Sequence, residues 1–313
     1  IDLNDEEQRL DNNQYIDTGN KPAALDVENR ADGTIILSCP YPLPEPKQST
    51  AHLFIERATE FPDRTLIAEK DDAGEWQHLT YGEALHGTRR VAQWLIDQGG
   101  SINAPLAIIS NSSIRHFLMA WGAIIARVPY VPVSYSYSTI PGAYPKFRAV
   151  LNTVKPKFIF AENLAPHLDA LSNIDTTGLH LITADKVTED SKRLPFDSTN
   201  WQALLDTMPT ADVDNSVEKI DHDTVTRYMF TSGSTGMPKG VIHDHGMSCY
   251  QLASSSAVRN RSGGEKEMKV LDWMPWSHVG AGVMRIANIL EEAGSVYLDT
   301  GKPTPEDFHK TIA

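Results

Sequence analysis

Cysteine and positive charge are scarce in this sequence, and it has no long apolar run. Two cysteines, Cys39 and Cys249, are too few for a disulfide framework or a cysteine zinc site, and we expect both to be buried thiols in the cytoplasm. Because 28 basic residues stand against 41 acidic ones without a basic stretch, we expect no nucleic-acid or membrane partner. No apolar run approaches the ~20 residues of a membrane-spanning helix, and the first residues show no secretory signal pattern.

What the sequence does have is an alternation of strand and helix patterns. Residues 1–48 are polar and rich in turn formers, and we interpret them as an N-terminal arm. From residue 49 onward, helical periodicity alternates with short apolar runs that are typical of buried strands. This alternation predicts an α/β fold of two stacked α/β subdomains with largely parallel sheets, the first at 49–205 and the second at 206–313.

The same periodicity predicts the individual elements. Residues 169–223 form a looser stretch, after which the alternation resumes. The predicted strands are 65–69, 76–80, 106–110, 130–134, 157–161, 225–230, 270–273 and 295–299. The predicted helices are 50–61, 82–98, 112–127, 146–154, 244–258 and 283–292.

The segment Thr231–Gly240, directly after the predicted strand 225–230, concentrates groups that bind anions. It holds four hydroxyl side chains, three glycines and Lys239 within ten residues. Glycine lets backbone N–H groups approach an anion closely, hydroxyls donate hydrogen bonds, and lysine adds a positive charge. The pattern predicts a site for a polyphosphate.

Two other interpretations of this segment are weaker. An ordinary P-loop has Ser or Thr directly after its lysine, whereas Gly240 follows Lys239 and Pro238 precedes it, so a P-loop kinase or ATPase is disfavoured by spacing. A polar surface turn is the non-functional alternative. A strand followed by four hydroxyls and then Pro-Lys-Gly is hard to produce by chance.

Residues 231–241, Thr-Ser-Gly-Ser-Thr-Gly-Met-Pro-Lys-Gly-Val, resemble the signature loop of the adenylate-forming superfamily. That superfamily includes acyl- and aryl-CoA synthetases, nonribosomal adenylation domains and firefly luciferase. Residues 80–85 and 129–134 resemble two further segments of it, so the resemblance covers most of residues 40–310. It implies that the chain is part of the large N-terminal domain of such an enzyme.

A second motif is similar to the feruloyl-CoA synthetase branch. It consists of residues 271–278, Leu-Asp-Trp-Met-Pro-Trp-Ser-His, and of 301–305, Gly-Lys-Pro-Thr-Pro. The similarity implies that Trp276, His278 and Gly280 line the acid pocket. The branch has bulkier residues where this chain has Val-Gly-Ala-Gly at 279–282, which leaves the exact aromatic acid open. From the residues alone, His278 is a helix-cap or core histidine and Trp273 belongs to the core.

The resemblance implies an ATP-dependent carboxylic acid:CoA ligase acting on an aromatic hydroxycinnamate such as ferulate. The acid and ATP first give an acyl-adenylate and pyrophosphate, and coenzyme A then displaces AMP. Catalytic roles fall on Lys239 and His278, with His278 near the reacting carboxylate. The implied cofactors are ATP, Mg²⁺ and coenzyme A, with no metal ligand within residues 1–313. The implied phosphate-binding residues are Thr231, Ser232, Gly233, Ser234, Thr235, Gly236 and Lys239.

Several parts of such an enzyme do not occur in this sequence. The Tyr-Gly-x-Thr-Glu segment that contacts adenine, the ribose-binding acid and the C-terminal lysine would lie beyond Ala313. Thr304-Pro305 predicts a helix start just before the chain stops, so we interpret the chain as a truncated fragment that is inactive alone. Another acyl-CoA synthetase, an adenylation domain and a non-catalytic nucleotide-binding module are the alternatives, and the oligomeric state is not predicted.

Overall fold

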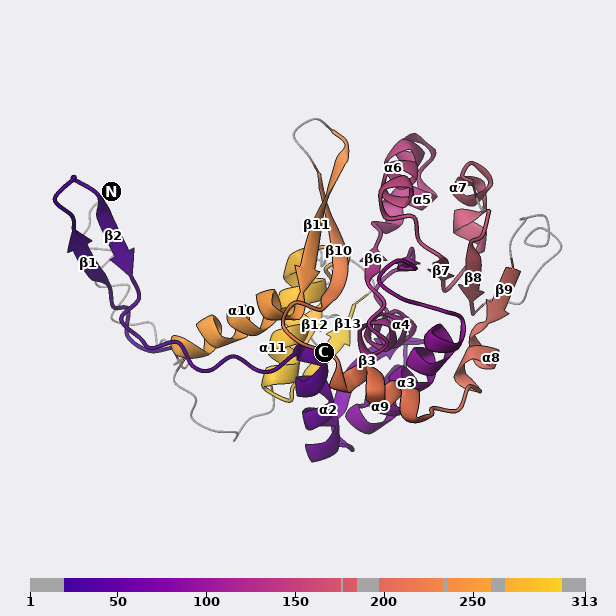
Figure 1. Ribbon diagram of the computed structural model, residues 1–313. Coiled ribbons are helices and arrows are strands. Elements are labelled where there is room, and N and C mark those ends of the chain that lie inside the picture. The colour runs from indigo at the N-terminus through magenta and orange to yellow at the C-terminus, as the bar shows by residue number, and fades with distance from the viewer. Residues whose placement is uncertain (1–19, 176, 185–196, 233–235, 260–267, 300–313) are drawn as a thin grey trace. The chain divides into compact units, whose positions relative to one another are not determined.

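The computed structural model describes residues 20–175, 177–184, 197–232, 236–259 and 268–299 (Figure 1). These residues divide into two compact units, one made of 20–45 with 253–259 and the other of 46–252 with 268–299. Within these ranges, no helix is both long enough and apolar enough to cross a membrane. The predicted helix start at Thr304 lies outside the described residues.

The smaller unit is built around a β-hairpin. Strands β1 (Asp26–Asn29) and β2 (Ile35–Ser38) pair antiparallel and are exposed along almost their whole length. Gly33 in the turn has a φ of +86°, which a residue without a Cβ adopts without strain. Cys39 follows β2 and is exposed, so its predicted burial is wrong; the residues of β2 before it are also largely exposed. Cys249 is buried, as predicted.

A seven-stranded sheet runs through the larger unit in the order β11-β10-β6-β5-β7-β8-β9. All neighbouring pairs are parallel except β10 with β11. The strands β5, β6 and β7 are buried on both faces, which explains their continuous apolar runs. The bounds are β5 (Leu106–Ile108), β6 (Tyr130–Pro132), β7 (Phe158–Ala161), β8 (His180–Thr183), β9 (Asp197–Asn200), β10 (Val225–Ser232) and β11 (Pro238–Asp244).

A second sheet has four strands in the order β12-β13-β3-β4. Its members are β12 (Lys269–Asp272), β13 (Ser295–Leu298), β3 (Thr65–Lys70) and β4 (Trp76–Thr80), and only β3 with β4 is antiparallel. The two largely parallel sheets confirm the predicted α/β fold class. Each sheet takes strands from before and after residue 205, and the predicted subdomain boundaries stay a prediction.

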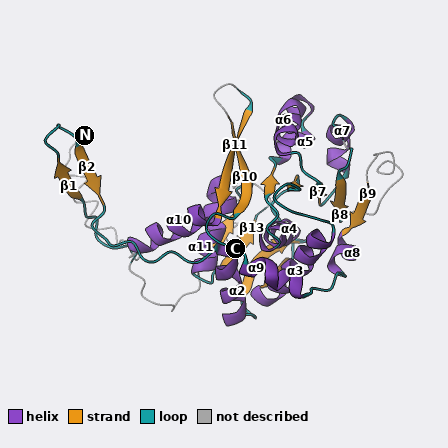
Figure 2. Cartoon of the chain, in the orientation of Figure 1, coloured by secondary structure: helices purple, strands orange, loops and turns teal. Residues whose placement is uncertain are grey.

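Helices cover both faces of the seven-stranded sheet (Figure 2). In β5, Leu106 and Ile108 pack into the cluster formed with α3 and α4, while Ala107 packs into the cluster formed with α6. Helix α4 is buried on nearly all sides because it contacts strands of both sheets. The bounds are α2 (Thr50–Glu60), α3 (Tyr81–Asp97), α4 (Ile114–Ile125), α5 (Tyr135–Thr139), α6 (Tyr144–Val154), α7 (Leu168–Ser172), α8 (Trp201–Leu205), α9 (Ala211–Glu218), α10 (His245–Ala257) and α11 (Ile286–Glu291).

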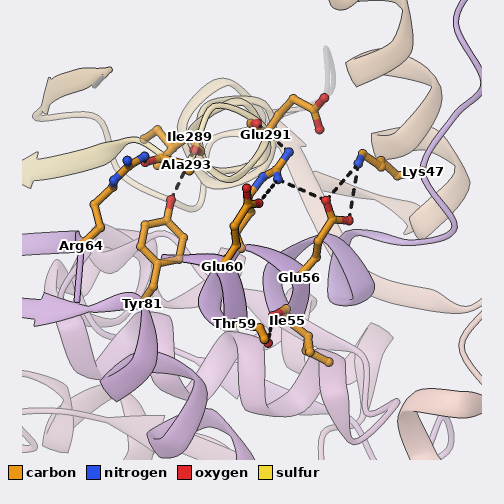
Figure 3. A network of polar contacts seen from close by, with 11 residues as sticks. Lys47, Ile55, Glu56, Thr59, Glu60, Arg64, Tyr81, Ile289, Glu291 and Ala293 are labelled. Atoms are coloured by element: carbon orange, nitrogen blue, oxygen red, sulfur yellow. Dashed lines mark hydrogen bonds and ion pairs between the residues drawn. The ribbon is translucent and has the colours of Figure 1, made fainter. Parts of the chain in front are cut away.

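The segment at 80–85 that resembles the superfamily begins helix α3. The Thr80 hydroxyl accepts from the Glu83 N–H at 3.2 Å, and the Glu83 carboxylate accepts from the Thr80 N–H at 2.8 Å, which makes a capping box. The buried Tyr81 hydroxyl donates to Gly294 O at 2.8 Å and to Ile289 O at 3.4 Å (Figure 3). This segment therefore joins α3 to the end of α11.

The looser stretch at 169–223 is more regular than predicted. It contains the strands β8 and β9 and the helices α8 and α9. These elements are short, and β9 (Asp-Ser-Thr-Asn) has no apolar residue, so periodicity could not find it. Its place is decided by pairing with β8 at the sheet edge.

Candidate functional site

Strands β10 and β11 form an antiparallel ribbon, and residues 231–232 and 238–240 of the predicted polyphosphate segment lie at its far end, which we call the tip (Figure 1). The register pairs Phe230 with Gly240 and Thr231 with Lys239. Only Arg227 of β10 pairs with β6, so the tip extends past the neighbouring parallel strand. The predicted order of strand, loop and strand-like exit is therefore confirmed, but the predicted loop bounds are wrong, because β10 extends to Ser232 and β11 begins at Pro238.

Thr231 and Lys239 lie directly opposite each other. Side chains at such a cross-strand position project to the same face, with Cβ atoms ~4.5–5.5 Å apart. Both residues are exposed, so a hydroxyl donor and an ammonium group meet at one open surface. The side chain of Ser232 and all of Gly233, Ser234 and Thr235 lie outside the described residues, and their assignments stay predictions.

The two described glycines of the segment have separate local reasons. Gly236 has a φ of +81°, in the region that residues with a Cβ rarely adopt. A Cβ on Gly240 would lie 3.2 Å from the ring of Phe230 across the ribbon. Between Tyr228 and His243 the sequence has no Asp or Glu, so no carboxylate of this segment offsets the charge of Lys239. The ribbon tip suits an anion.

His278 caps a helical turn that begins two residues later. The Gly280 N–H donates to His278 Nδ1 at 3.1 Å, and the Ala281 and Gly282 N–H groups donate to His278 O at 3.2 and 2.9 Å. The turn, Gly280–Arg285, is π-helical, a rare geometry that is frequent at functional sites. The helix-cap interpretation of His278 is confirmed; its imidazole is exposed, and its predicted catalytic role stays a prediction.

Two tryptophans precede this turn. Trp273 was predicted to lie in the core and Trp276 to line the acid pocket. Trp273 is 40% exposed, so its predicted place in the core is wrong, because strand β12 ends at Asp272 and the chain turns outward there. Trp276 is 5% exposed and packs edge-on against His116 at 5.2 Å. Its backbone N–H donates to Ser112 Oγ at 3.1 Å. Trp276 thus supports the turn from beneath, and its part in an acid pocket stays a prediction.

An ion pair between Asp272 and Arg285, which the sequence did not predict, joins the two ends of residues 272–285. Asp272 is buried and pairs with Arg285, so the first and last residues of 272–285 meet. The Met274 N–H donates to the same Asp272 oxygen at 3.0 Å. The signal was the acid at the end of an apolar strand, since a buried carboxylate needs a partner. His278 and Gly280 therefore lie on a closed loop.

Arg227 is a second residue that sequence reasoning missed. It lies on β10, is 3% exposed, and donates from Nη1 to Gly282 O at 2.9 Å. Burial lowers the pKa of His243, and the positive charge of Arg227 lowers it further. The strand that leads to the ribbon tip thus contacts the turn that follows His278.

A contrasting arrangement occurs at the carboxyl ends of β5 and β7. Ser113 caps α4 and donates from Oγ to Glu162 Oε2 at 2.6 Å. Arg115 donates to the other Glu162 oxygen at 2.8 Å, and the Ile114 N–H donates to Glu69 Oε2 at 2.8 Å. Burial raises the pKa of Glu69, and the charge of Glu162 raises it further. The protein's own carboxylates hold this helix N-terminus.

Two hollows in the described surface lie elsewhere. One of about 500 Å³ is lined by Lys157, His180 and Asp197, and one of about 650 Å³ lies beside His86 and Arg90. Neither contains a predicted site residue, so the ribbon and the turn carry the argument for the site. Within the described ranges, no group of three or more His, Cys, Asp or Glu side chains is placed to hold a metal ion.

Comparison with known proteins places these features in a family. The family model described as AMP-binding enzyme matches residues 54–313, which includes the ribbon and the His278 turn. One of the mycosubtilin synthase proteins of Bacillus subtilis is 24% identical over 265 residues, which are 82% of this chain and 9% of that protein. A long-chain-fatty-acid–CoA ligase of Thermus thermophilus is 24% identical over 245 residues, which are 78% of this chain and 42% of that protein.

Solved structures show the same fold. The N-terminal domain of FACL13 from Mycobacterium tuberculosis superposes with a TM-score of 0.64 at 19% identity, covering 85% of this chain and 60% of that one. The fold is thus that of the N-terminal domain of adenylate-forming enzymes, as predicted. The chain spans less than half the length of the two curated relatives above.

Proposed function

Because the chain belongs to the AMP-binding enzyme family, we propose that it carries the phosphate- and acid-binding parts of an ATP-dependent carboxylic acid:CoA ligase. The reaction converts an acid, ATP and coenzyme A into an acyl-CoA, AMP and pyrophosphate. The observation that carries the proposal is the register of the ribbon. It sets Thr231 opposite Lys239 at an exposed tip without an acidic residue.

In this proposal the ribbon tip holds the β- and γ-phosphates of ATP. Thr231 and Ser232 donate hydroxyl hydrogen bonds, and the glycine-rich turn lets backbone N–H groups face the anion. Lys239 neutralises charge as pyrophosphate leaves after attack of the carboxylate on the α-phosphate. Mg²⁺ would reach the site through the phosphates, because residues 228–243 supply no carboxylate ligand. Gly233, Ser234, Thr235 and Gly236 complete the proposed cradle.

The acid lies on the side of the π-helical turn. His278 and Gly280 are accessible there, and Trp276 supports the turn from the core. We propose an aromatic hydroxycinnamate such as ferulate, supported by the similarity of residues 271–278 to the feruloyl-CoA synthetase branch. A cytoplasmic location belongs to the same proposal.

An adenylation domain that loads a carrier protein is the second candidate. The match to a mycosubtilin synthase protein favours it, since that relative is as similar to this chain as the CoA ligase is. The two candidates share the first half-reaction and differ in the thiol that accepts the acyl group. A non-catalytic nucleotide-binding module is disfavoured by the exposed Lys239 in its paired register.

The experiment is ATP–pyrophosphate exchange by the protein at its natural full length. The panel contains ferulate, benzoate, hexadecanoate and L-aspartate, and thioester formation with free coenzyme A is measured beside it. We expect the fastest exchange with ferulate and a CoA thioester as product. Exchange that is fastest with L-aspartate and gives no CoA thioester would favour the carrier-loading candidate. No exchange with any acid would contradict both.

A further inference from the structure

Arg227 is a buried cation in an apolar strand. Its side chain is 3% exposed, and no carboxylate of the described ranges forms an ion pair with it. A buried charge is costly unless hydrogen bonds or an opposite charge compensate it, so such a residue is retained for a specific contact. Its neighbours show what that contact is.

Neutral groups on three elements surround the guanidinium. Nη1 donates to Gly282 O at 2.9 Å, Nε donates to Thr226 Oγ1 at 3.3 Å, and Cζ lies 5.4 Å from the centre of the Tyr130 ring. Thr226 Oγ1 in turn donates to His243 O at 2.9 Å, across the ribbon. Of these contacts, the one with Gly282 joins the sheet to the turn Gly280–Arg285.

The position of Arg227 along β10 ties it to the ribbon tip. Side chains alternate along a strand, so Arg227, Met229 and Thr231 share one face, while Tyr228 and Phe230 pack on the other against the cluster formed with α6. Four residues of strand separate Arg227 from Thr231 by about 13 Å. The guanidinium therefore lies on the face to which Thr231 points.

On the other side, Gly282 belongs to the loop that presents His278. A Cβ on Gly282 would lie 2.0 Å from Trp276 O, so the turn packs directly onto the backbone of Trp276. The Gly282 N–H also donates to His278 O at 2.9 Å. The position of Gly282 is thus coupled to the backbone of His278 by a hydrogen bond and to the backbone of Trp276 by direct packing.

The two sides differ in how firmly they are held without Arg227. The ribbon keeps its place through the ladder between β10 and β11, which extends to the tip. The π-helical turn has no strand pairing, and within the described residues the side-chain hydrogen bond that joins it to β10 is the one from Arg227 to Gly282 O. The Asp272–Arg285 pair holds the far end of the turn, so loss of the guanidinium would release the Gly282 carbonyl at its middle and leave the ribbon in place.

We propose that Arg227 is a positioning residue for adenylation, which sets the distance between the acid site at His278 and the phosphate site at Thr231 and Lys239. The inference rests on the function proposed above. Since in-line attack on the α-phosphate needs both reactants in register, a displacement of about 1 Å is enough to cost a large factor in rate. Arg227 itself touches neither reactant.

The test compares Arg227→Met and Arg227→Lys in ATP–pyrophosphate exchange by the full-length protein. Arg227→Met keeps the bulk and removes every donor, and we expect it to lower kcat/KM for the acid about tenfold to hundredfold while KM for ATP changes less than twofold. Arg227→Lys can still donate to Gly282 O, and we expect it to recover most of the loss.

Arg64→Met is the matched control. Arg64 donates from Nη1 to Ala293 O at 2.9 Å, so this change also removes an arginine–carbonyl hydrogen bond, but near α11 and away from the proposed site (Figure 3). It is expected to lower the thermal unfolding temperature while kcat/KM for the acid stays within twofold of that of the unmodified protein. Gly282→Ala displaces the turn without touching Arg227, and we expect the same selective loss for the acid.

The outcomes separate this inference from the proposed function. A selective loss for the acid in Arg227→Met, with recovery in Arg227→Lys, supports it. An unchanged kcat/KM for the acid, a KM for ATP that rises as much as kcat/KM for the acid falls, or no recovery by lysine overturns it and leaves the ligase assignment standing. Absence of exchange by the unmodified protein with every acid overturns the ligase assignment and this inference together.

Discussion

Two hydroxyl-rich segments lie at the ends of strands in this chain, residues 110–113 after β5 and residues 231–236 at the end of β10. They differ in the acidic residues near them. Ser110–Ser113 follows β5 and leads into α4, where Glu69 and Glu162 accept the Ile114 N–H and the Ser113 hydroxyl. Residues 231–236 start with the last two residues of β10, and the sequence from Tyr228 to His243 has no acid at all. We call 110–113 the closed segment, because carboxylates of the protein accept its hydrogen bonds, and 231–236 the open segment, because its neighbours in sequence include no acid.

Topology alone would have pointed to the closed segment. The order β6-β5-β7-β8-β9 reverses direction at β5, and sheets of this kind bind ligands in the crevice at such a switch point. Here Glu162 and Glu69 already take the donors of that helix N-terminus. Hydroxyl content therefore does not identify an anion site, whereas the local balance of charge does.

Lys239→Ala has the largest expected effect and tests whether the open segment binds phosphate. If the open segment binds phosphate, losing this cation lowers the exchange rate by at least 100-fold, which is about 2.7 kcal/mol of transition-state stabilisation. Stability should stay within about 0.5 kcal/mol because the side chain is exposed. Lys219→Ala removes an exposed lysine at the end of α9 and should leave the rate unchanged. Equal rates for both variants would remove the distinction between the two segments.

His245, which directly follows β11, should make the stability of the protein depend on pH. Burial lowers the pKa of His245 to about 3, and the charge of Arg227 contributes. The unfolded chain takes up a proton below pH 6.5 and the folded chain does not until about pH 3, so stability falls as pH drops through this window. From pH 7 to pH 5 we expect this group to cost about 2 kcal/mol.

His245→Asn should remove that part of the pH dependence. The asparagine oxygen can replace His245 Nδ1, which accepts from the Thr50 N–H at 3.2 Å. Urea unfolding at pH 7 and pH 5 gives the difference for each protein. An unchanged difference in the variant would show that His245 is not the group that titrates.

Glu162→Ala tests the closed segment. It leaves the Ser113 hydroxyl without its charged acceptor, and we expect the free energy of unfolding to fall by about 1.5 kcal/mol. The contact with Arg115 adds little because that side chain is half exposed. Urea denaturation measures the loss, and KM for ATP should not change. A raised KM for ATP with unaltered stability would make the closed segment a nucleotide site.

Glu69→Gln has the smallest expected effect. Burial raises the pKa of Glu69, so its ionised form costs stability in the folded state above that pKa and costs nothing below 4.5. The neutral amide should therefore make the protein more stable than the unmodified one at pH 8, and the gain should vanish at pH 4. A gain that grows as pH falls would reverse the assigned sign.

The sequence predicted most elements and the loop because their signals are local. The alternation of helices and strands and the return through β11 need no knowledge of distant contacts, whereas the extension of β10 to Ser232 comes from its pairing with β11. Tertiary contacts decided the rest. Trp276 is buried because its N–H meets Ser112, 164 positions away, and this leaves Trp273 outside.

The same reason explains why Arg227 escaped notice. An arginine in a strand normally indicates an exposed edge, and its partner Gly282 lies 55 positions further along the chain. The exposed Cys39 is a similar case, since its hairpin has little packed against it. Residues 185–196, 233–235 and 300–313 lie outside the described structure, so expectations for them stand as predictions.

The most direct test of the central claim is lysine labelling of the full-length protein with and without Mg·ATP, read by mass spectrometry. If the ribbon tip holds the triphosphate, saturating nucleotide protects Lys239 from acylation and leaves Lys219 at its original rate. Equal labelling of Lys239 in both conditions would contradict the account.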